Sequence, residues 1–358
     1  MKRFPLAALL AAFFVFLVLA VSVRQGVLLL VGVGMGAALA GARFGFTTGW
    51  RQLIEQKNPQ GVAGQLLLLA LASLAALPLL GQFPELHAAL GPPSVSLLVG
   101  AFVFGLTMQI ADGCGSGTLY KAGMGVPLNM GILPLFALGS FFGSVHLDRW
   151  LALGQIAPVG FSTVLGTTGA LALTFGLLAL TGLLVRAWVG PGRQWLVRRW
   201  VWGAVALAVL ATVNLLLAGQ PWGVVYGFGL WAGKLSTALG LFDPAANAFW
   251  SQPGNAQRMT QTVLMDVTTI TNIGILGGAL WISARSGVEP ARPLEPQQWA
   301  VGLVAGFLLG YSSRLAFGCN IGAMLSGIST GSLHGWLWVP LAFCGSLIGV
   351  RVRRHYRF

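Results

Sequence analysis

Two cysteines in similar glycine-rich surroundings are the residues best suited to chemistry in this sequence. Cys114 lies in GLTMQIADGCGSGTLYKAG (105–123) and Cys319 in GYSSRLAFGCNIGAMLSGI (310–328). A neutral thiol is small and weakly polar, so it can make a weak contact with a soft, polarizable group. Two neighbouring thiols can also exchange with a disulfide. The pair therefore predicts either non-covalent binding of a polarizable ligand or thiol redox chemistry.

The two cysteine motifs belong to a longer internal repeat. At one constant offset, Gly105, Ala111, Gly113, Cys114 and Gly117 align with Gly310, Ala316, Gly318, Cys319 and Gly322. After a shift of one residue the alignment continues and pairs Pro134 with Pro340. Glycine is abundant, at 51 of 358 residues, so the aligned cysteines and prolines carry the match. We therefore expect two related, pseudo-symmetric helical halves, an organisation that many transporters share.

The composition places these halves in a membrane. Hydrophobic residues make up 56% of the chain and charged residues 8%, and the mean hydropathy is +0.80. Soluble domains carry about 25% charged residues, a disordered chain is far less apolar, and a disulfide scaffold needs more than three cysteines. The sequence predicts an all-α polytopic membrane protein. Its apolar segments lie at about 27–42, 62–81, 95–111, 129–147, 161–185, 200–218, 222–240, 262–283, 298–316 and 335–350.

The expected organisation has four parts. Residues 1–26 resemble a signal anchor, because Lys2 and Arg3 precede an apolar run. Residues 27–185 are expected to form the first transmembrane half, 186–199 a basic cytoplasmic loop, and 200–358 the second transmembrane half.

The net charge of +13 arises mostly from short connectors and the C-terminal tail. The basic residues there are Arg43, Arg51, Lys57, Arg186, Arg193, Arg198, Arg199, Arg351, Arg353, Arg354 and Arg357. Short loops rich in Lys and Arg mark the cytoplasmic side of an inner-membrane protein, so nucleic-acid binding is not expected. The connector 82–94 lacks Lys and Arg and suits the outside. These loops and the basic C-terminal tail cannot all lie on their preferred sides if every apolar segment spans, so at least one segment is expected to be re-entrant or miscounted.

Each motif places G-C-x-x-G after one apolar run and before a shorter one. Irregular backbone at membrane depth occurs where it is buried in protein or lines a cavity. We therefore expect short re-entrant or discontinuous helices there, and a substrate site near the middle of the membrane whose free N–H groups favour an anion. The candidate path residues are Cys114, Cys319, Gly113, Gly117, Gly318 and Gly322.

Charged residues inside apolar segments are further candidates, because an intramembrane charge is costly and usually functional. Lys121 and Lys234 are expected either to contact an anion or to reach the membrane interface. Arg314, five residues before Cys319, either guides an anion or anchors a helix end. Asp112 and Asp266 either pair with a cation or carry a proton. A third cysteine, at position 344 in an apolar segment, is expected to pack as a small apolar side chain.

These motifs resemble those of the YeeE/YedE family of sulfur-compound transporters. The resemblance rests on residues 112–118, on 317–322, and on 227–231 followed by Lys234, and it covers 27–358. It implies a pseudo-symmetric helical fold pinched at its middle, with cysteines along a path for uptake of thiosulfate or a similar sulfur oxyanion. The location implied is the bacterial cytoplasmic membrane, and the partners implied are the lipid bilayer and a small cytoplasmic sulfur-carrier protein.

A third family motif departs from the expected pattern. The family's R-F-C falls on Arg43-Phe44-Gly45, so Gly45 stands where a cysteine is expected. This leaves open whether the substrate is thiosulfate or another sulfur or selenium species. Two further functions fit the same residues: a membrane thiol redox protein, which needs an electron acceptor, and a passive membrane subunit that acts with a partner. The sequence has no metal-ligand spacing, phosphate-binding loop or dinucleotide fingerprint, so we expect no cofactor, no metal and no enzymatic activity.

Overall fold

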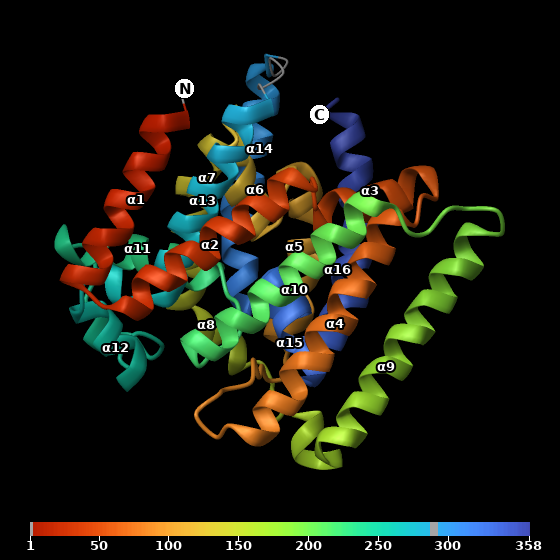
Figure 1. The fold of residues 1–358 in the computed structure, drawn as a ribbon, viewed down its shortest axis with the longest axis horizontal. Coiled ribbons are helices and arrows are strands. Elements are labelled where there is room, and N and C mark those ends of the chain that lie inside the picture. The colour runs from red at the N-terminus through yellow and green to blue at the C-terminus, as the bar shows by residue number, and fades with distance from the viewer. Residues whose placement is uncertain (1–2, 287–292) are drawn as a thin grey trace.

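The long apolar stretches of the sequence form helices that lie side by side in a bundle (Figure 1). The computed structural model describes residues 3–286 and 293–358. In chain order its elements are α1 (Arg3–Ala20), α2 (Val23–Gly41), α3 (Phe46–Gln56), α4 (Gln60–Gln82), α5 (Val95–Ile110), α6 (Gly115–Gly123), α7 (Pro127–Val145), α8 (Leu147–Leu151), α9 (Phe161–Val189), α10 (Arg198–Ala218), α11 (Val225–Ala238), η1 (Pro244–Ala246), α12 (Pro253–Thr260), η2 (Val263–Met265), α13 (Val267–Ser286), α14 (Pro296–Leu315), η3 (Asn320–Ser326), α15 (Gly327–Ser329) and α16 (Leu333–His355). Lys2, part of the expected signal anchor, lies outside the described residues.

Nine helical segments of the described chain are long and apolar enough to cross a membrane. They are Val23–Gln56, Gln60–Gln82, Val95–Gly123, Pro127–Val145, Phe161–Val189, Arg198–Ala218, Val267–Ala284, Pro296–Ser329 and Leu333–His355. A shorter apolar helix, α1, packs against α2 and α13. Helix α9 lies at the edge of the bundle (Figure 1). With no strand among the described residues, the prediction of an all-α polytopic membrane protein is confirmed.

The apolar segment expected to span at 222–240 does not do so. Helix α11 has 14 residues, about 21 Å of helix, whereas a span needs roughly 20 residues. The helix begins inside the protein: the carbonyl oxygen of Val224 accepts a hydrogen bond from Asn272 of α13, and that of Val225 accepts one from Ser140 of α7. Neighbouring helices, rather than lipid, therefore surround the start of this stretch, and apolar composition alone could not distinguish the two environments.

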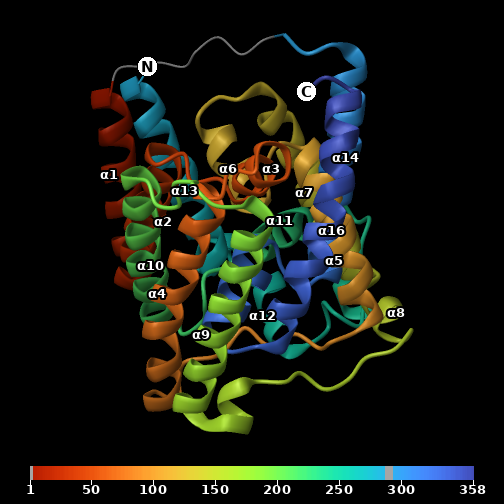
Figure 2. The same cartoon turned by 90° about the vertical axis from the view of Figure 1, so that its right-hand side faces the viewer.

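Leaving α11 out of the count resolves the conflict between the basic loops and the basic C-terminal tail. Helix α1 and the nine spanning segments make an even number of crossings, and both termini lie at the same end of the bundle (Figure 2). The alternation of helices puts the loops 43–61 and 186–199 at this end and the connector 82–94 at the other. The positive-inside rule then assigns the end with the termini to the cytoplasm. We call the opposite end the outer end.

Repeat-related glycines bring helices of the two motifs into backbone contact. A Cβ atom on Gly105 of α5 would collide with the carbonyl oxygen of Ala342 of α16. One on Gly310 of α14, which aligns with Gly105 in the repeat, would collide with the carbonyl oxygen of Phe136 of α7. Small residues allow such close approach between membrane helices. The correspondence supports the expected pseudo-symmetry around the motifs, whereas the division of the chain into halves at 185 and 200 stays a prediction.

Candidate functional site

Both cysteine motifs interrupt a spanning segment with a left-handed residue. Helix α5 ends at Ile110, Asp112 has a φ of 54°, and Cys114 then caps the start of α6. Helix α14 ends at Leu315, Phe317 has a φ of 57°, and Cys319 then caps the start of η3. Each left-handed residue therefore stands two positions before its cysteine. Gly318 follows Phe317 with a φ of 148°, a conformation that residues with a side chain rarely adopt.

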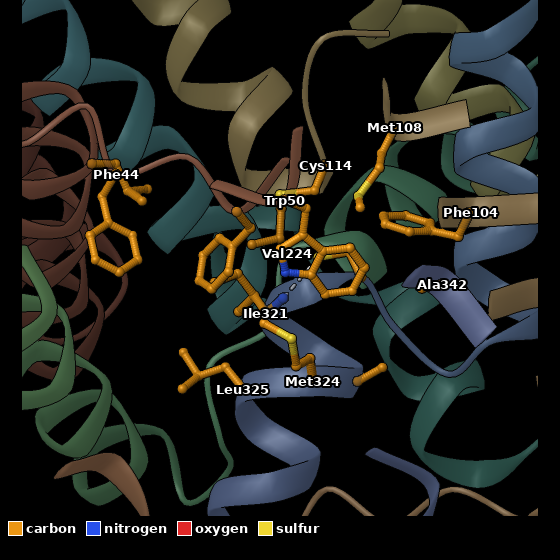
Figure 3. Packing of buried hydrophobic residues seen from close by; sticks show 14 of the residues in the cluster. Phe44, Trp50, Phe104, Met108, Cys114, Val224, Ile321, Met324, Leu325 and Ala342 are labelled. Carbon is orange, nitrogen blue, oxygen red and sulfur yellow. Dashed lines mark hydrogen bonds between the residues drawn. The ribbon is translucent and has the colours of Figure 1, made fainter. Parts of the chain in front are cut away.

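The two thiols are buried and accept hydrogen bonds from the first turns that they cap. Cys114 Sγ accepts from the N–H of Gly117 at 3.4 Å and lies 3.5 Å from the hydroxyl of Ser116. Cys319 Sγ accepts from the N–H of Ile321 at 3.4 Å. Both cysteines are free thiols, and they are 1% and 0% exposed, respectively. Figure 3 shows Cys114 and Ile321 within one cluster of buried side chains.

The start of α6 lies against the start of η3. A Cβ atom on Gly115, the residue after Cys114, would lie 3.0 Å from Cys319 Sγ. A Cβ on Gly113 would lie 2.7 Å from the amide nitrogen of Thr118, and one on Gly318 would lie 2.5 Å from that of Ala323. Glycine at 115 therefore lets the two short helices meet, whereas Gly113 and Gly318 let each break fold back against its own short helix. A Cβ on Gly117 or Gly322 would make an ordinary contact, 3.5 Å from Cys114 Sγ and 3.8 Å from the carbonyl oxygen of Phe317, respectively.

A buried amide beside Cys319 has no partner. Asn320 is 0% exposed, and neither its side-chain oxygen nor its nitrogen makes a hydrogen bond to a described residue. An unpaired buried polar group costs about 1–3 kcal/mol, so such a group in a native site indicates a place for a ligand or water. The sequence prediction misses Asn320, although a polar residue next to the motif cysteine was the available signal.

The position expected to hold a third cysteine lies beside α6. Gly45 caps the start of α3, and a Cβ atom there would lie 2.9 Å from the hydroxyl of Thr48 and 3.6 Å from the hydroxyl of Tyr120. Its φ of −105° is ordinary for any residue. The backbone therefore allows a cysteine, but the side chain of Thr48 would have to move to make room for its Cβ.

Asp112 is the centre of a cluster of three cations. Its carboxylate accepts hydrogen bonds from Arg51 of α3 at 2.7 Å and from Lys121 of α6 at 2.6 Å, and the guanidinium of Arg353 of α16 lies 3.5 Å away. Lys121 also donates to the backbone carbonyl of Asp112. Of the two roles expected for Asp112, the structure therefore shows pairing with cations. The cluster keeps two positive charges in excess of its one carboxylate.

The remaining charged candidates lie at the outer end. The guanidinium of Arg314 stacks on two aromatic rings, and its Nε is buried without a partner among the described residues. Lys234 donates hydrogen bonds to the carbonyl oxygens of Met259 and Gln261, at the end of α12. Asp266 caps α13, because its carboxylate accepts from the N–H and hydroxyl of Thr269. The roles of Lys121, Lys234 and Arg314 as anion contacts stay predictions.

The expectation for Cys344 is wrong. Its side chain is exposed on α16 and does not pack inside the protein. The apolar character of its segment reflects a surface turned towards lipid, which the sequence pattern does not separate from a buried helix face.

Two known transporters are similar to this chain over most of its length. It is similar to the thiosulfate transporter TsuA of Spirochaeta thermophila, with 27% identity over 323 residues that cover 86% of this chain and 93% of the relative. It is also similar to the thiosulfate transporter TsuA of Escherichia coli, with 23% identity, over 92% of this chain and 96% of the relative. The probable transporter YedE of Escherichia coli is 26% identical over 171 residues, or 46% of this chain, and in that comparison the chain spans only 41% of the length of YedE.

The family comparison covers both cysteine motifs. The profile described as sulphur transport matches residues 41–348, from the end of α2 to the last third of α16. The two broken segments, α5 with α6 and α14 with η3, lie within this range. On that coverage, the chain belongs to the sulphur transport family.

Proposed function

We propose that this protein takes up thiosulfate or a related sulfur-containing anion across the bacterial cytoplasmic membrane, along a path that passes Cys114 and Cys319. The observation that carries the proposal is the meeting of two buried helix starts, each capped by a free thiol. Membership of the sulphur transport family and the likeness to TsuA support the substrate class. A small cytoplasmic sulfur-carrier protein as partner stays a prediction from the family resemblance.

The start of α6 provides what an anion needs at the middle of a membrane. The first N–H groups of a helix have no partner within the helix, and the helix dipole makes this end positive. Discontinuous helices place such ends at the substrate sites of many transporters. The backbone next to Cys114 can therefore offset the loss of water around an anion without a fully charged side chain at the narrowest point.

Thiols suit this narrow point because they bind weakly. A path conducts when each site is favourable enough to enter and weak enough to leave. A lysine or arginine in place of Cys114 or Cys319 would hold a dianion too tightly, whereas a neutral S–H group is a weak donor to a polarizable sulfur. The two cysteines therefore act as successive weak contacts, and no covalent bond to the substrate is required.

Asn320 adds an unpaired polar group directly beside Cys319. Its free amide can donate to an oxygen of the anion, which would remove part of the energetic cost of its unpaired burial. On the cytoplasmic side, the surplus positive charge around Asp112 gives the anion a second favourable region on its way to the cell interior. Gly45, near Tyr120, leaves this part of the path with no third thiol.

The test is uptake of radiolabelled thiosulfate by cells that lack their own sulfate and thiosulfate importers. We expect Cys114→Ala and Cys319→Ala each to lower uptake at least tenfold at equal amounts of protein in the membrane. Cys344→Ala is the matched control, because this exposed thiol lies outside the path, and its uptake should equal that of the unchanged chain. Full uptake by both Cys114→Ala and Cys319→Ala would contradict the cysteine-lined path.

A thiol redox function predicts a different result in the same cells. A thiol redox protein would need Cys114 and Cys319 to form a disulfide and to pass electrons to an acceptor. Activity that disappears under a membrane-permeant reductant and returns on its removal would favour that function. We expect uptake to persist in the reductant.

A further inference from the structure

We propose that Arg258 and Arg314 form an anion-capture site on the ring of Tyr226, at the outer end of the protein. The site collects the transported dianion before it reaches the thiols, and in this respect the inference rests on the proposed function. Arg258 comes from α12, Arg314 from α14 and Tyr226 from α11, so three elements that are distant in sequence build the site.

The two guanidinium groups share one aromatic ring. The central carbon of the Arg258 guanidinium lies 4.9 Å from the centre of the Tyr226 ring, and that of Arg314 lies 5.6 Å from the same point. Arg314 also lies 4.8 Å from the centre of the Phe249 ring. Cation–π contacts of this kind hold a guanidinium in place while leaving its N–H groups free to bind another molecule.

Neither guanidinium is neutralised by the part of the chain that the structure describes. No described carboxylate forms an ion pair with Arg258 or Arg314. Arg258 makes one long hydrogen bond, 3.4 Å, to the side-chain oxygen of Gln220. Arg314 makes none to a described residue, and its Nε is buried. Two like charges near one ring repel each other, and a bound dianion would remove that repulsion.

Each arginine also stands in the last turn of its helix, where a cation stabilises the helix dipole. This explains one cation at each helix end. It does not explain why both converge on Tyr226, whose hydroxyl donates to Asn255 of α12 at 2.9 Å and so holds the ring in place. Asn255 in turn donates to the carbonyl oxygen of Phe249, which holds the second ring of the site.

The position of the site suits the first contact that the transported anion makes on its way into the protein. Arg314 ends α14 only five residues before Cys319, and residues 317 and 318 between them form the left-handed break. Arg258, Tyr226 and Phe249 are only partly buried, so an anion from outside can approach them. An oxyanion bound there lies at the start of the segment that leads to the thiol of Cys319.

The first test measures uptake kinetics in the cells described above. For Arg258→Gln and Arg314→Gln we expect KM for thiosulfate to rise about tenfold, equivalent to roughly 1.4 kcal/mol, with the maximal rate within twofold of the unchanged chain. Arg314→Lys keeps the charge and should recover part of the affinity. Arg149→Gln is the matched control, an exposed arginine of α8 at the same end, and should leave KM unchanged. Unchanged KM in both Arg258→Gln and Arg314→Gln, or a fall in maximal rate alone, would overturn the capture site.

A second test separates the dianion from a lipid phosphate, which has similar chemistry. Binding of radiolabelled thiosulfate is measured on the purified full chain in lipid nanodiscs made of phosphatidylcholine alone or with added phosphatidylglycerol. We expect Arg258→Gln to weaken binding in both lipids. Equal binding by the variant and the unchanged chain in discs with phosphatidylglycerol would mean that lipid occupies the arginines, and the capture site would be rejected. Binding without uptake by the unchanged chain would reject the proposed function and leave the capture site standing.

Discussion

Arg51 donates a 2.7 Å hydrogen bond to the carboxylate of Asp112 and thereby ties α3 to the break between α5 and α6. Lys121 and Arg353 approach the same carboxylate, so four elements meet at one acidic side chain. Asp112 is also the left-handed residue of the break. The ion cluster therefore fixes the backbone conformation from which Cys114 and the first turn of α6 begin.

Replacing the carboxylate should leave the three cations without a counter-charge. We expect Asp112→Asn to lower the free energy of unfolding by roughly 3 kcal/mol, because both side chains of its pair with Arg51 are less than a quarter exposed. Denaturant titration of the purified protein in detergent measures this change. Glu55→Gln is the control: its partner Arg354 is 62% exposed, so the loss should stay within about 1 kcal/mol. Equal losses in the two variants would contradict the structural role of Asp112.

We expect the side chain of Asn320 to serve transport while lowering the stability of the folded protein. Asn320→Leu removes two unpaired polar atoms, so we expect the free energy of unfolding to rise by about 1 kcal/mol while KM for thiosulfate uptake increases. Asn129→Leu is the comparison, because Asn129 donates a 3.1 Å hydrogen bond to the carbonyl oxygen of Ala111 at the other break. That variant should lose about 1 kcal/mol. A loss of stability in Asn320→Leu would show that its amide is paired in the resting protein.

The three thiols should differ in their reactivity. A membrane-permeant maleimide should label Cys344 in the native protein, slowly because a thiol that faces lipid stays protonated, and all three cysteines after denaturation. Cys344→Ser should abolish native labelling, because Cys114 and Cys319 are buried. Mass spectrometry of the labelled protein counts the adducts. Rapid native labelling of Cys114 would instead indicate an open path in the absence of substrate.

Restoring the third cysteine should strengthen thiosulfate uptake. Gly45 has a φ open to any residue, and a Cβ there would lie 3.6 Å from the hydroxyl of Tyr120, so we expect Gly45→Cys to fold after a small shift of the Thr48 side chain. Its thiol adds one weak contact, which should lower KM about twofold relative to Gly45→Ala. Initial uptake rates across thiosulfate concentrations give this ratio. Identical KM values for the two variants would mean that the path does not pass position 45.

The sequence alone predicts the spans well and the charged contacts poorly. Long apolar runs must form helices in a bilayer, because every backbone group there needs a partner within the segment. The apolar stretch that contains α11 is an exception, because it does not span. Gly227 and Gly229 let its start pack against α13 and α7, and these contacts depend on the tertiary fold. The repeat also predicted short, discontinuous helices at both cysteine motifs, where α6 and η3 begin.

Long-range partners explain what the sequence could not show. Arg353 reaches Asp112 from the last helix of the described chain, and Arg258 and Arg314 both contact the ring of Tyr226. The spacing of residues along the chain does not predict such contacts, because they depend on how helices that are distant in sequence pack. The prediction for Cys344 failed for the related reason that an apolar helix face looks the same in sequence whether it meets protein or lipid.

The backbone contact of Gly105 with Ala342 sets an order for biosynthesis. Helix α5 ends at Ile110, but its partner α16 does not begin until Leu333. At about 5–20 residues per second, the ribosome needs on the order of ten seconds or more to synthesise the intervening chain. During that interval the glycine face of α5 has no final partner in the bilayer. The nascent protein must therefore enter the bilayer before the glycine face of α5 can pack against α16. A truncated product that lacks α16 should be a preferred target for membrane proteases.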